Sequence, residues 1–203
     1  MQTHDPAEPD AAAAALAALL QRRSIGPKHL TEPGPDEAQL LRMAEAALRG
    51  PDHGERVPFR FSVVRGPARE AMATLFADAA RRAGKDEAGV ALDAERALRP
   101  PVTVAVLARI EPQLAEVPPP EQWACVGGAL ANFLNAAHLM GFGAKMLSGA
   151  KARDPQVAAA FCEPGETLLG WVALGTPLKQ GGASRKPAPE AVLGDWVPPS
   201  LRP

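Results

Sequence analysis

The sequence predicts an α+β fold, because helical and strand patterns alternate without the signature of a nucleotide-binding sheet. Long helical stretches follow two of the predicted strands, and neither Gly-x-Gly-x-x-Gly nor Gly-x-x-x-x-Gly-Lys-Ser/Thr comes after a strand. The chain has 203 residues, of which 46% are hydrophobic and 4% aromatic. This size suits one domain or a compact pair, with a core built mainly of alanine, leucine and valine.

Six helices are predicted from apolar residues at helical spacing and from the glycine and proline residues that bound them. The first covers residues 7–23 and ends in two arginines, which complement the dipole at the C-terminus of a helix. The second begins near Asp36 and stops at Gly50-Pro51. The others are expected at residues 68–83, 85–99, 121–140 and 154–161.

Four strands are predicted between these helices. Residues 59–64 alternate between apolar and polar side chains, and the apolar run at residues 102–108 indicates a strand that is buried on both faces. A short strand lies within the glycine-rich segment 141–149, and the last clear strand covers residues 167–174. We expect a polar loop at residues 26–35. From Thr176 onward we expect an extended chain, over a surface or along a partner subunit.

Charge and cysteine content exclude several classes of protein. The formal net charge of −1 provides no basic field for general nucleic-acid binding. Cys125 and Cys162 lack the spacing of a disulfide framework or a metal site. Acidic residues precede the N-terminal apolar run and the arginine pair follows it, so we expect no targeting segment and a reduced, cytoplasmic location.

The predicted helix at residues 121–140 is the most apolar of the chain and approaches the length of a membrane span. Polar residues such as Asn132 and His138 interrupt it, so we expect a helix that is buried on all sides in a soluble protein, without a membrane partner. Gly127 and Gly128 would allow another backbone to approach closely. Such a helix suits a core or a subunit interface.

An arginine-rich segment follows the first predicted helix. Arg22, Arg23 and Ser24 place two guanidinium groups and a hydroxyl on adjacent residues, next to a loop that contains glycine. Guanidinium groups are permanently charged, forked donors for phosphate oxygens, and a serine adds a short hydrogen bond. The segment therefore predicts a phosphate site, with capping of the helix C-terminus as the alternative.

Two further segments carry candidate side chains. The Gly50-Pro51 corner places Arg49 and His53 where they either face a ligand or lie exposed in solvent. The glycine-rich segment 141–149 allows close backbone approach to a flat or anionic group and includes Ser148, or it forms only a helix C-cap and a strand. No Gly-x-Ser-x-Gly turn is present, which disfavours a serine, histidine and aspartate relay.

In this order, the three segments resemble the nitroreductase family of FMN-dependent NAD(P)H oxidoreductases, in its small single-domain bacterial branch. The resemblance spans roughly residues 14–178 and includes the Leu-Gly-Thr-Pro sequence that ends at Pro177. It implies a nitroreductase-like, intertwined α+β homodimer with a central, mainly antiparallel sheet and FMN at the subunit interface. It further implies one FMN-binding domain at residues 1–178, with about ten flexible N-terminal residues, and an extended tail at residues 179–203.

The resemblance also implies roles for the candidate residues. Residues 22–24 would hold the FMN phosphate and ribityl chain from one subunit, and Arg49 and His53 would approach from the other. Three residues of the glycine-rich segment would complete the site: Met146, Leu147 and Ser148. The flavin would carry the chemistry at its N5 atom, so that no side chain acts as a catalytic acid or base.

The sequence departs from this branch of the family at two positions. Phe59 stands where the branch usually has a tryptophan, and Leu147 stands where it has the arginine of an aromatic-Arg-Ser sequence. The missing arginine leaves two alternatives. Either FMN binds more weakly, or another cation, such as Lys145 or Lys28, takes over the contact.

The resemblance implies that NAD(P)H reduces an electron-poor small molecule, such as a nitroaromatic, quinone or enone, in a ping-pong reaction through the flavin. Two alternatives stand beside it. One is a non-catalytic dimeric interaction module on the same scaffold, and the other is an offshoot that uses FMN for dehalogenation or consumes the flavin. A flavin spectrum that NADPH bleaches would exclude the first, and product analysis would identify the second.

Overall fold

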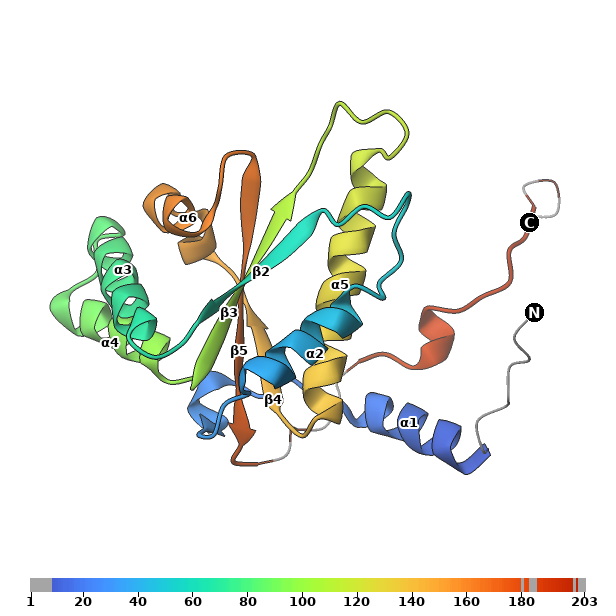
Figure 1. Ribbon diagram of the computed structural model, residues 1–203, viewed down its shortest axis with the longest axis horizontal. Coiled ribbons are helices and arrows are strands. Elements are labelled where there is room, and N and C mark those ends of the chain that lie inside the picture. The colour runs from blue at the N-terminus through green and yellow to red at the C-terminus, as the bar shows by residue number, and fades with distance from the viewer. Residues whose placement is uncertain (1–8, 180, 183–185, 199, 201–203) are drawn as a thin grey trace.

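A five-stranded sheet lies between two groups of helices (Figure 1). The structure, a computed structural model, describes residues 9–179, 181–182, 186–198 and 200. Most of the predicted flexible N-terminus and part of the predicted tail therefore lie outside the described residues. The named strands pair only in antiparallel fashion, which confirms the predicted α+β fold. The strands are β1 (Leu30–Thr31), β2 (Phe59–Val64), β3 (Val102–Arg109), β4 (Gly143–Leu147) and β5 (Glu166–Pro177).

The long strand β5 pairs with three other strands of the sheet, β1, β3 and β4. It pairs with β3 along one edge and with β4 and then β1 along the other, while β2 pairs with the far edge of β3. Gly170 lies at an irregularity in the pairing of β3 with β5 and has a φ of 139°. A Cβ atom at this position would lie 2.1 Å from the carbonyl oxygen of Leu147. Glycine is therefore required here for the end of β4 to approach β5.

Two helices, α2 (Glu37–Ala47) and α5 (Pro119–Leu139), cover one face of the sheet (Figure 1). Asp36 caps α2, because its carboxylate accepts a hydrogen bond of 2.8 Å from the backbone N–H of Gln39. Prolines begin α5, where the first turn of a helix leaves backbone N–H groups without a helical partner. Met43 and Phe133 are fully buried between these helices and the sheet.

Three helices, α3 (Ala68–Arg82), α4 (Glu87–Leu98) and α6 (Pro155–Phe161), form the layer on the other face (Figure 1). Leu107 of β3 and Val157 of α6 are fully buried in this layer. The ring of Trp171, on β5, packs edge-on against the ring of Phe76 at 4.9 Å between centroids. Alanine and valine supply many of the other buried side chains, as the low aromatic content of the sequence predicts.

Most predicted elements occur within two or three residues of their predicted bounds. Strand β2 has the bounds that the alternating pattern predicts. Helix α1 (Pro9–Gln21) ends before the two arginines that we predicted inside it. The prediction of a loop at residues 26–35 is wrong in part, because this segment contains a 3-10 helix, η1 (Pro27–His29), and strand β1. Two residues are too few to show the alternation by which a strand is predicted.

One side of α5 is exposed in the single chain, so the expectation of a helix buried on all sides is wrong for one subunit. Trp123 is 41% exposed and Leu139 is 53% exposed, and Gly127 lies on the same open side. Gly128 is used for a close contact, because a Cβ atom there would lie 2.8 Å from Cδ of Pro51. None of the described helices has the length and hydropathy that a membrane span needs.

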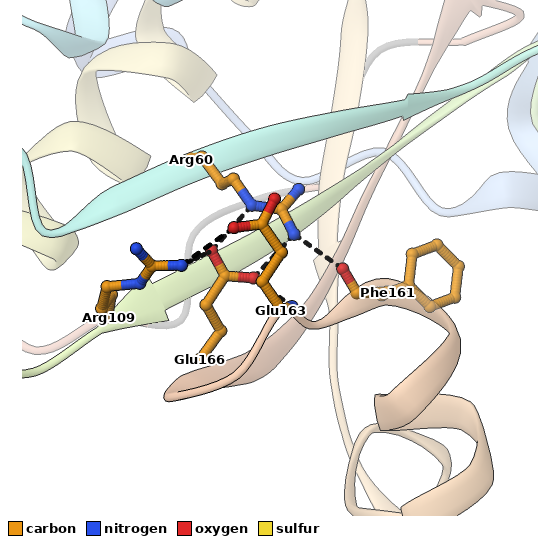
Figure 2. Close-up of polar contacts among 5 residues, drawn as sticks. All are labelled: Arg60, Arg109, Phe161, Glu163 and Glu166. Atoms are coloured by element: carbon orange, nitrogen blue, oxygen red, sulfur yellow. Dashed lines mark hydrogen bonds and ion pairs between the residues drawn. The ribbon is translucent and has the colours of Figure 1, made fainter.

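An ion cluster holds β2 to the start of β5 across β3 (Figure 2). The Arg60 guanidinium donates to both carboxylate oxygens of Glu166, at 2.7 and 2.6 Å, and to the carbonyl oxygen of Phe161 at 2.8 Å. The Glu166 side chain is only 4% exposed. Arg109 and Glu163 extend the cluster toward solvent. Arg60 therefore stabilises the sheet, and its contacts in the described chain lie within this cluster.

Candidate functional site

The arginine-rich segment after α1 runs beside β4. Ser24 forms a parallel bridge with Ala144, and the backbone N–H of Ile25 donates to the Ala144 carbonyl oxygen at 3.0 Å. Arg23 donates through Nη1 to the carbonyl oxygens of Leu20, at 2.7 Å, and Arg22, at 2.9 Å. One nitrogen of Arg23 therefore caps the end of α1, as the alternative interpretation predicted. The side chains of both arginines are partly exposed and Ser24 is exposed.

A cavity of about 580 Å³ lies at the start of β4, which we call the Arg23 cavity. Its cationic side chains are Arg23 and Lys179, and its histidine is His138. The ring Nε2 of His138 is 2.8 Å from the carbonyl oxygen of Ala18, which fixes α1 against the end of α5. The remaining described residues of its lining are Gln21, Ile25, Gly141, Phe142, Gly143, Pro177, Gly181 and Gly182.

A second cavity, of about 510 Å³, lies at the opposite end of β4, and we call it the Trp171 cavity. Among the described residues, five cationic side chains line it, together with one carboxylate and a set of apolar groups. The cations are Lys28, Arg96, Arg99, Lys145 and Lys151, and the carboxylate is Asp93. The apolar side chains include Met72, Phe76, Ala97, Leu147 and Trp171. This lining suits a ligand that is partly flat and apolar and partly anionic.

Two residues that line the Trp171 cavity each carry a buried polar atom without a hydrogen-bond partner among the described residues. They are Nε1 of Trp171 and Oγ1 of Thr103, on residues that are 4% and 3% exposed. Buried donors almost always find a partner in a folded protein, because an unpaired one costs about 1–3 kcal/mol. Both atoms are shielded from solvent, so they lie behind the surface of the cavity, which is lined by the cations and the apolar side chains.

The Asp93 carboxylate joins three cations, of which Arg96 and Lys151 line the Trp171 cavity. Its Oδ2 atom accepts hydrogen bonds from Lys85 at 2.6 Å and Lys151 at 2.8 Å, and Arg96 lies 3.7 Å from Oδ1. Burial by itself raises the pKa of Asp93, but hydrogen bonds from the two lysines outweigh it, so the pKa lies below the ordinary value of an aspartate. Asp93 is therefore ionised and fixes the cations around it.

The two cavities lie at the two ends of one strand and share a positive field. Strand β4 has five residues, which corresponds to roughly 13 Å between its first and last Cα atoms. The pKa of His29 is lowered first by desolvation and then by the charges of Lys179, which lines one cavity, and Lys28, which lines the other. An elongated anionic ligand that lies along β4 would reach both cavities.

His53 lies far from the arginine-rich segment within one chain, and Arg49 precedes Gly50, which packs against the middle of α5. The His53 ring Nδ1 is 2.7 Å from a carboxylate oxygen of Glu121, in the first turn of α5, and Arg49 is exposed. His138, which lines the Arg23 cavity, is in the last turn of the same helix. Seventeen residues of α5 separate Glu121 from His138, which corresponds to about 25 Å along the helix axis. A single chain does not bring these candidate residues together.

The residues of the glycine-rich segment divide between the two faces of the sheet. Leu147 and Ser148 line the Trp171 cavity, whereas Met146 packs against the core below α5. Lys28 and Lys145, the cations that we considered as substitutes for an arginine at Leu147, both line the cavity beside it. The residues of this cavity that the sequence reasoning missed include Thr103 of β3, Asp93 of α4, Lys151 of η2 (Ala150–Arg153) and Trp171 of β5.

Comparison with known proteins finds one family across most of the chain. The sequence profile described as "Nitroreductase family" matches residues 19–176. A curated relative from Escherichia coli strain K12, named "Putative NAD(P)H nitroreductase YdjA", is 34% identical over 171 residues, which cover 84% of this chain and 92% of the relative. A Haemophilus influenzae relative of the same description is 32% identical and covers 82% of this chain and 90% of its own length.

Solved structures show the same fold. A nitroreductase-like family protein from Bacillus cereus superposes with a TM-score of 0.76 at 18% identity, over 97% of this chain and 98% of that chain. A Desulfovibrio desulfuricans protein, solved in complex with FMN, superposes with a TM-score of 0.66 at 24% identity, over 97% of this chain and all of that chain. At these identities the likeness is one of architecture.

Proposed function

The chain belongs to the nitroreductase family, and we propose that it is an FMN-dependent oxidoreductase in which NAD(P)H reduces an electron-poor small molecule. The observation that carries the proposal is the pair of cavities along β4, one with arginine at its wall and the other with cations and apolar side chains. The names of the curated relatives include NAD(P)H, and a structural relative was solved with FMN.

The described residues fit FMN by their chemistry. FMN has a phosphate dianion at one end and, at the other, a flat ring system whose carbonyl groups accept hydrogen bonds. The Trp171 cavity offers apolar side chains for the ring, and Lys28, Lys145 and Ser148 at its wall carry hydrogen-bond donors for the carbonyl groups. Its volume of about 510 Å³ lies within the roughly 300–1,000 Å³ that small-molecule sites occupy.

We assign the phosphate end to the arginine-rich segment. Arg22, Arg23 and Ser24 lie beside the start of β4, and Arg23 shares its cavity with Lys179. Guanidinium groups bind phosphate with charge-assisted hydrogen bonds that do not depend on pH in the physiological range. The cap that Arg23 forms on α1 uses one of its nitrogens and fixes the side chain beside the cavity.

We assign the ring end to the Trp171 cavity. Leu147 and Ser148 bring the end of β4 to its wall, and Lys28 and Lys145 supply cations at the point where Leu147 stands in place of an arginine. When bound, FMN supplies the redox chemistry, since it accepts a hydride from NAD(P)H and reduces the acceptor. The chain orients the ring, excludes water from one side of it and sets the charge around it.

A second subunit would complete each site. His53 lies at the far end of α5 from the Arg23 cavity, and the Gly50-Pro51 corner next to Arg49 packs against the middle of this helix. An antiparallel approach of two α5 helices would bring one chain's corner toward the other chain's cavity. The open side of α5 has Trp123 and Leu139, and α1 exposes Leu16 and Leu20. Exposed apolar side chains of this size are typical of a surface that a subunit interface covers.

The first experiment measures FMN binding by absorbance and fluorescence titration. We expect the wild-type protein to bind FMN and NADPH to bleach its spectrum under anaerobic conditions. The double variant R22A/R23A should bind FMN at least about 100-fold more weakly, because two charge-assisted contacts are lost. R81A, which removes an exposed arginine of α3, should bind like the wild type. A wild-type protein without flavin, or equal binding by R22A/R23A, would contradict the proposal.

Complementation extends the same titration to the shared site. R22A/R23A and R49A/H53A homodimers should both bind FMN weakly. A mixed dimer of the two variants has one site with every residue intact and one site with both sets removed. It should therefore bind one FMN per two chains with wild-type affinity. A mixed dimer that binds no better than either parent would contradict a site built from two subunits.

A further inference from the structure

Lys151 is a long side chain that the structure holds in place on the wall of the Trp171 cavity. Its ammonium donates to the Asp93 carboxylate at 2.8 Å and lies 5.5 Å from the centroid of the Phe76 ring. The Lys151 side chain is 28% exposed and the Asp93 side chain 2%. A free lysine samples many rotamers in water, whereas a buried carboxylate and an aromatic face together select one position.

The Asp93 carboxylate has a second lysine on a different side. Lys85 donates to the same Oδ2 atom at 2.6 Å, but Lys85 is not among the described residues that line the cavity. The two lysines therefore share a contact and differ in what else they face. This difference gives a matched pair of substitutions, one at the cavity wall and one outside it.

The charge of the cofactor changes when it is reduced. A hydride is one proton with two electrons, so its addition to a neutral flavin leaves a flavin anion, and the hydride donor leaves as the oxidised nicotinamide. A fixed cation nearby attracts the anion and has little effect on the neutral ring. The attraction is stronger where apolar groups displace water, and the wall of the Trp171 cavity includes apolar side chains.

We propose that Asp93 is a positioning residue that fixes the Lys151 ammonium at the cavity wall, where this charge favours the reduced, anionic flavin over the neutral oxidised one. The inference rests on the proposed function, because it requires FMN in the Trp171 cavity. It assigns a role to two residues that make no contact with the arginine-rich segment in the described chain.

The experiment measures the reduction potential of the bound FMN against a reference dye, together with the Kd for oxidised FMN. In K151M the ratio of affinities for reduced and oxidised flavin should fall about tenfold, which lowers the potential by about 30 mV. The Kd for oxidised FMN should change less than about threefold. K151R, which keeps the charge, should restore most of the potential, and K85M should leave it near the wild-type value.

D93N separates positioning from simple charge. If Asp93 fixes Lys151, D93N releases the ammonium and lowers the potential, as K151M does. If Asp93 acts only through its own negative charge, D93N raises the potential and the positioning role is overturned. Equal potentials in K151M and the wild type, or equal shifts in K151M and K85M, overturn the role of Lys151.

Two controls keep these outcomes distinct. Thermal unfolding of each variant verifies that it is folded, and K151Q replaces K151M should the methionine variant not fold. A wild-type protein that binds no FMN overturns the proposed function and the inference with it. FMN binding with the same potential in every variant overturns the inference alone.

Discussion

Replacing Arg60 with methionine measures how strongly the ion cluster at the start of β5 stabilises the sheet. In R60M the Glu166 carboxylate, 4% exposed, loses two charge-assisted hydrogen bonds of 2.7 and 2.6 Å and keeps two weaker supports. These are the backbone N–H of Glu163 at 2.7 Å and the Arg109 guanidinium at 3.6 Å. Methionine preserves much of the apolar volume of the arginine stem, so the change isolates the charge.

The size of the effect follows from burial. Removing one partner of a fully buried ion pair costs about 3–5 kcal/mol, because the other charge stays buried without compensation. The Arg60 side chain is 35% exposed, so water reaches part of the site and the remaining contacts offset some of the loss. We expect R60M to lower the free energy of unfolding by about 2–4 kcal/mol.

Urea unfolding followed by tryptophan fluorescence measures this value, at one fixed protein concentration because the proposed dimer makes stability depend on concentration. R109M is the matched control. It removes an arginine of the same cluster that is 47% exposed, and it should cost at most about 1 kcal/mol. The double variant R60M/E166Q should recover at least about 1 kcal/mol relative to R60M, because no charge is left buried. Equal losses in R60M and R109M, or no recovery in the double variant, would refute the reasoning.

Two further predictions concern the same end of the sheet. The hydrogen bond from Arg60 lowers the pKa of Glu166 and outweighs burial, which by itself would raise it. The ionised Glu166 therefore contributes to stability above about pH 4.3, and this contribution is lost as the pH falls through the lowered pKa. In E166Q, the fall in the urea midpoint between about pH 5 and pH 3 should therefore be smaller than in the wild type. E163Q, which removes a more exposed carboxylate of the cluster, is the control. A fall in E166Q as steep as in the wild type would count against this prediction. G170A should cost about 2–4 kcal/mol or prevent folding, because a Cβ atom would meet the Leu147 carbonyl oxygen, whereas G194A, in open space, should be near neutral in the same assay.

The sequence predicts the elements whose signals are local. Strand β2 alternates over six residues, and β3 is an apolar run between prolines and a polar segment, so each has a pattern long enough to recognise. Strand β1 has two residues and exists because the segment before it packs against β4 and β5. Its pairing depends on residues 176 and 177, far along the chain, and no local pattern can show that.

The candidate site also contains residues that the sequence reveals and residues that only the fold brings together. Arg22, Arg23 and Ser24 are adjacent in sequence and form a recognisable motif, and they do lie beside β4. Asp93 and Trp171 are buried residues of a helix and a strand, whose types are ordinary for those elements. They become a site only because α4 and β5 meet around one cavity. The unpartnered nitrogen of Trp171 is visible only in the structure.

The position of β5 in the chain has a consequence for synthesis on the ribosome. Strands β1, β3 and β4 are all synthesised before β5, with which they pair, and β1 can pair only after residues 176 and 177 have been synthesised. Pairings over such distances form slowly, because a long loop has to close first. Until β5 emerges, one edge of the apolar strand β3 is open to pairing with other chains. Nascent chains stalled before residue 166 should therefore depend on chaperones, and both cavities would form only in the last stage of folding.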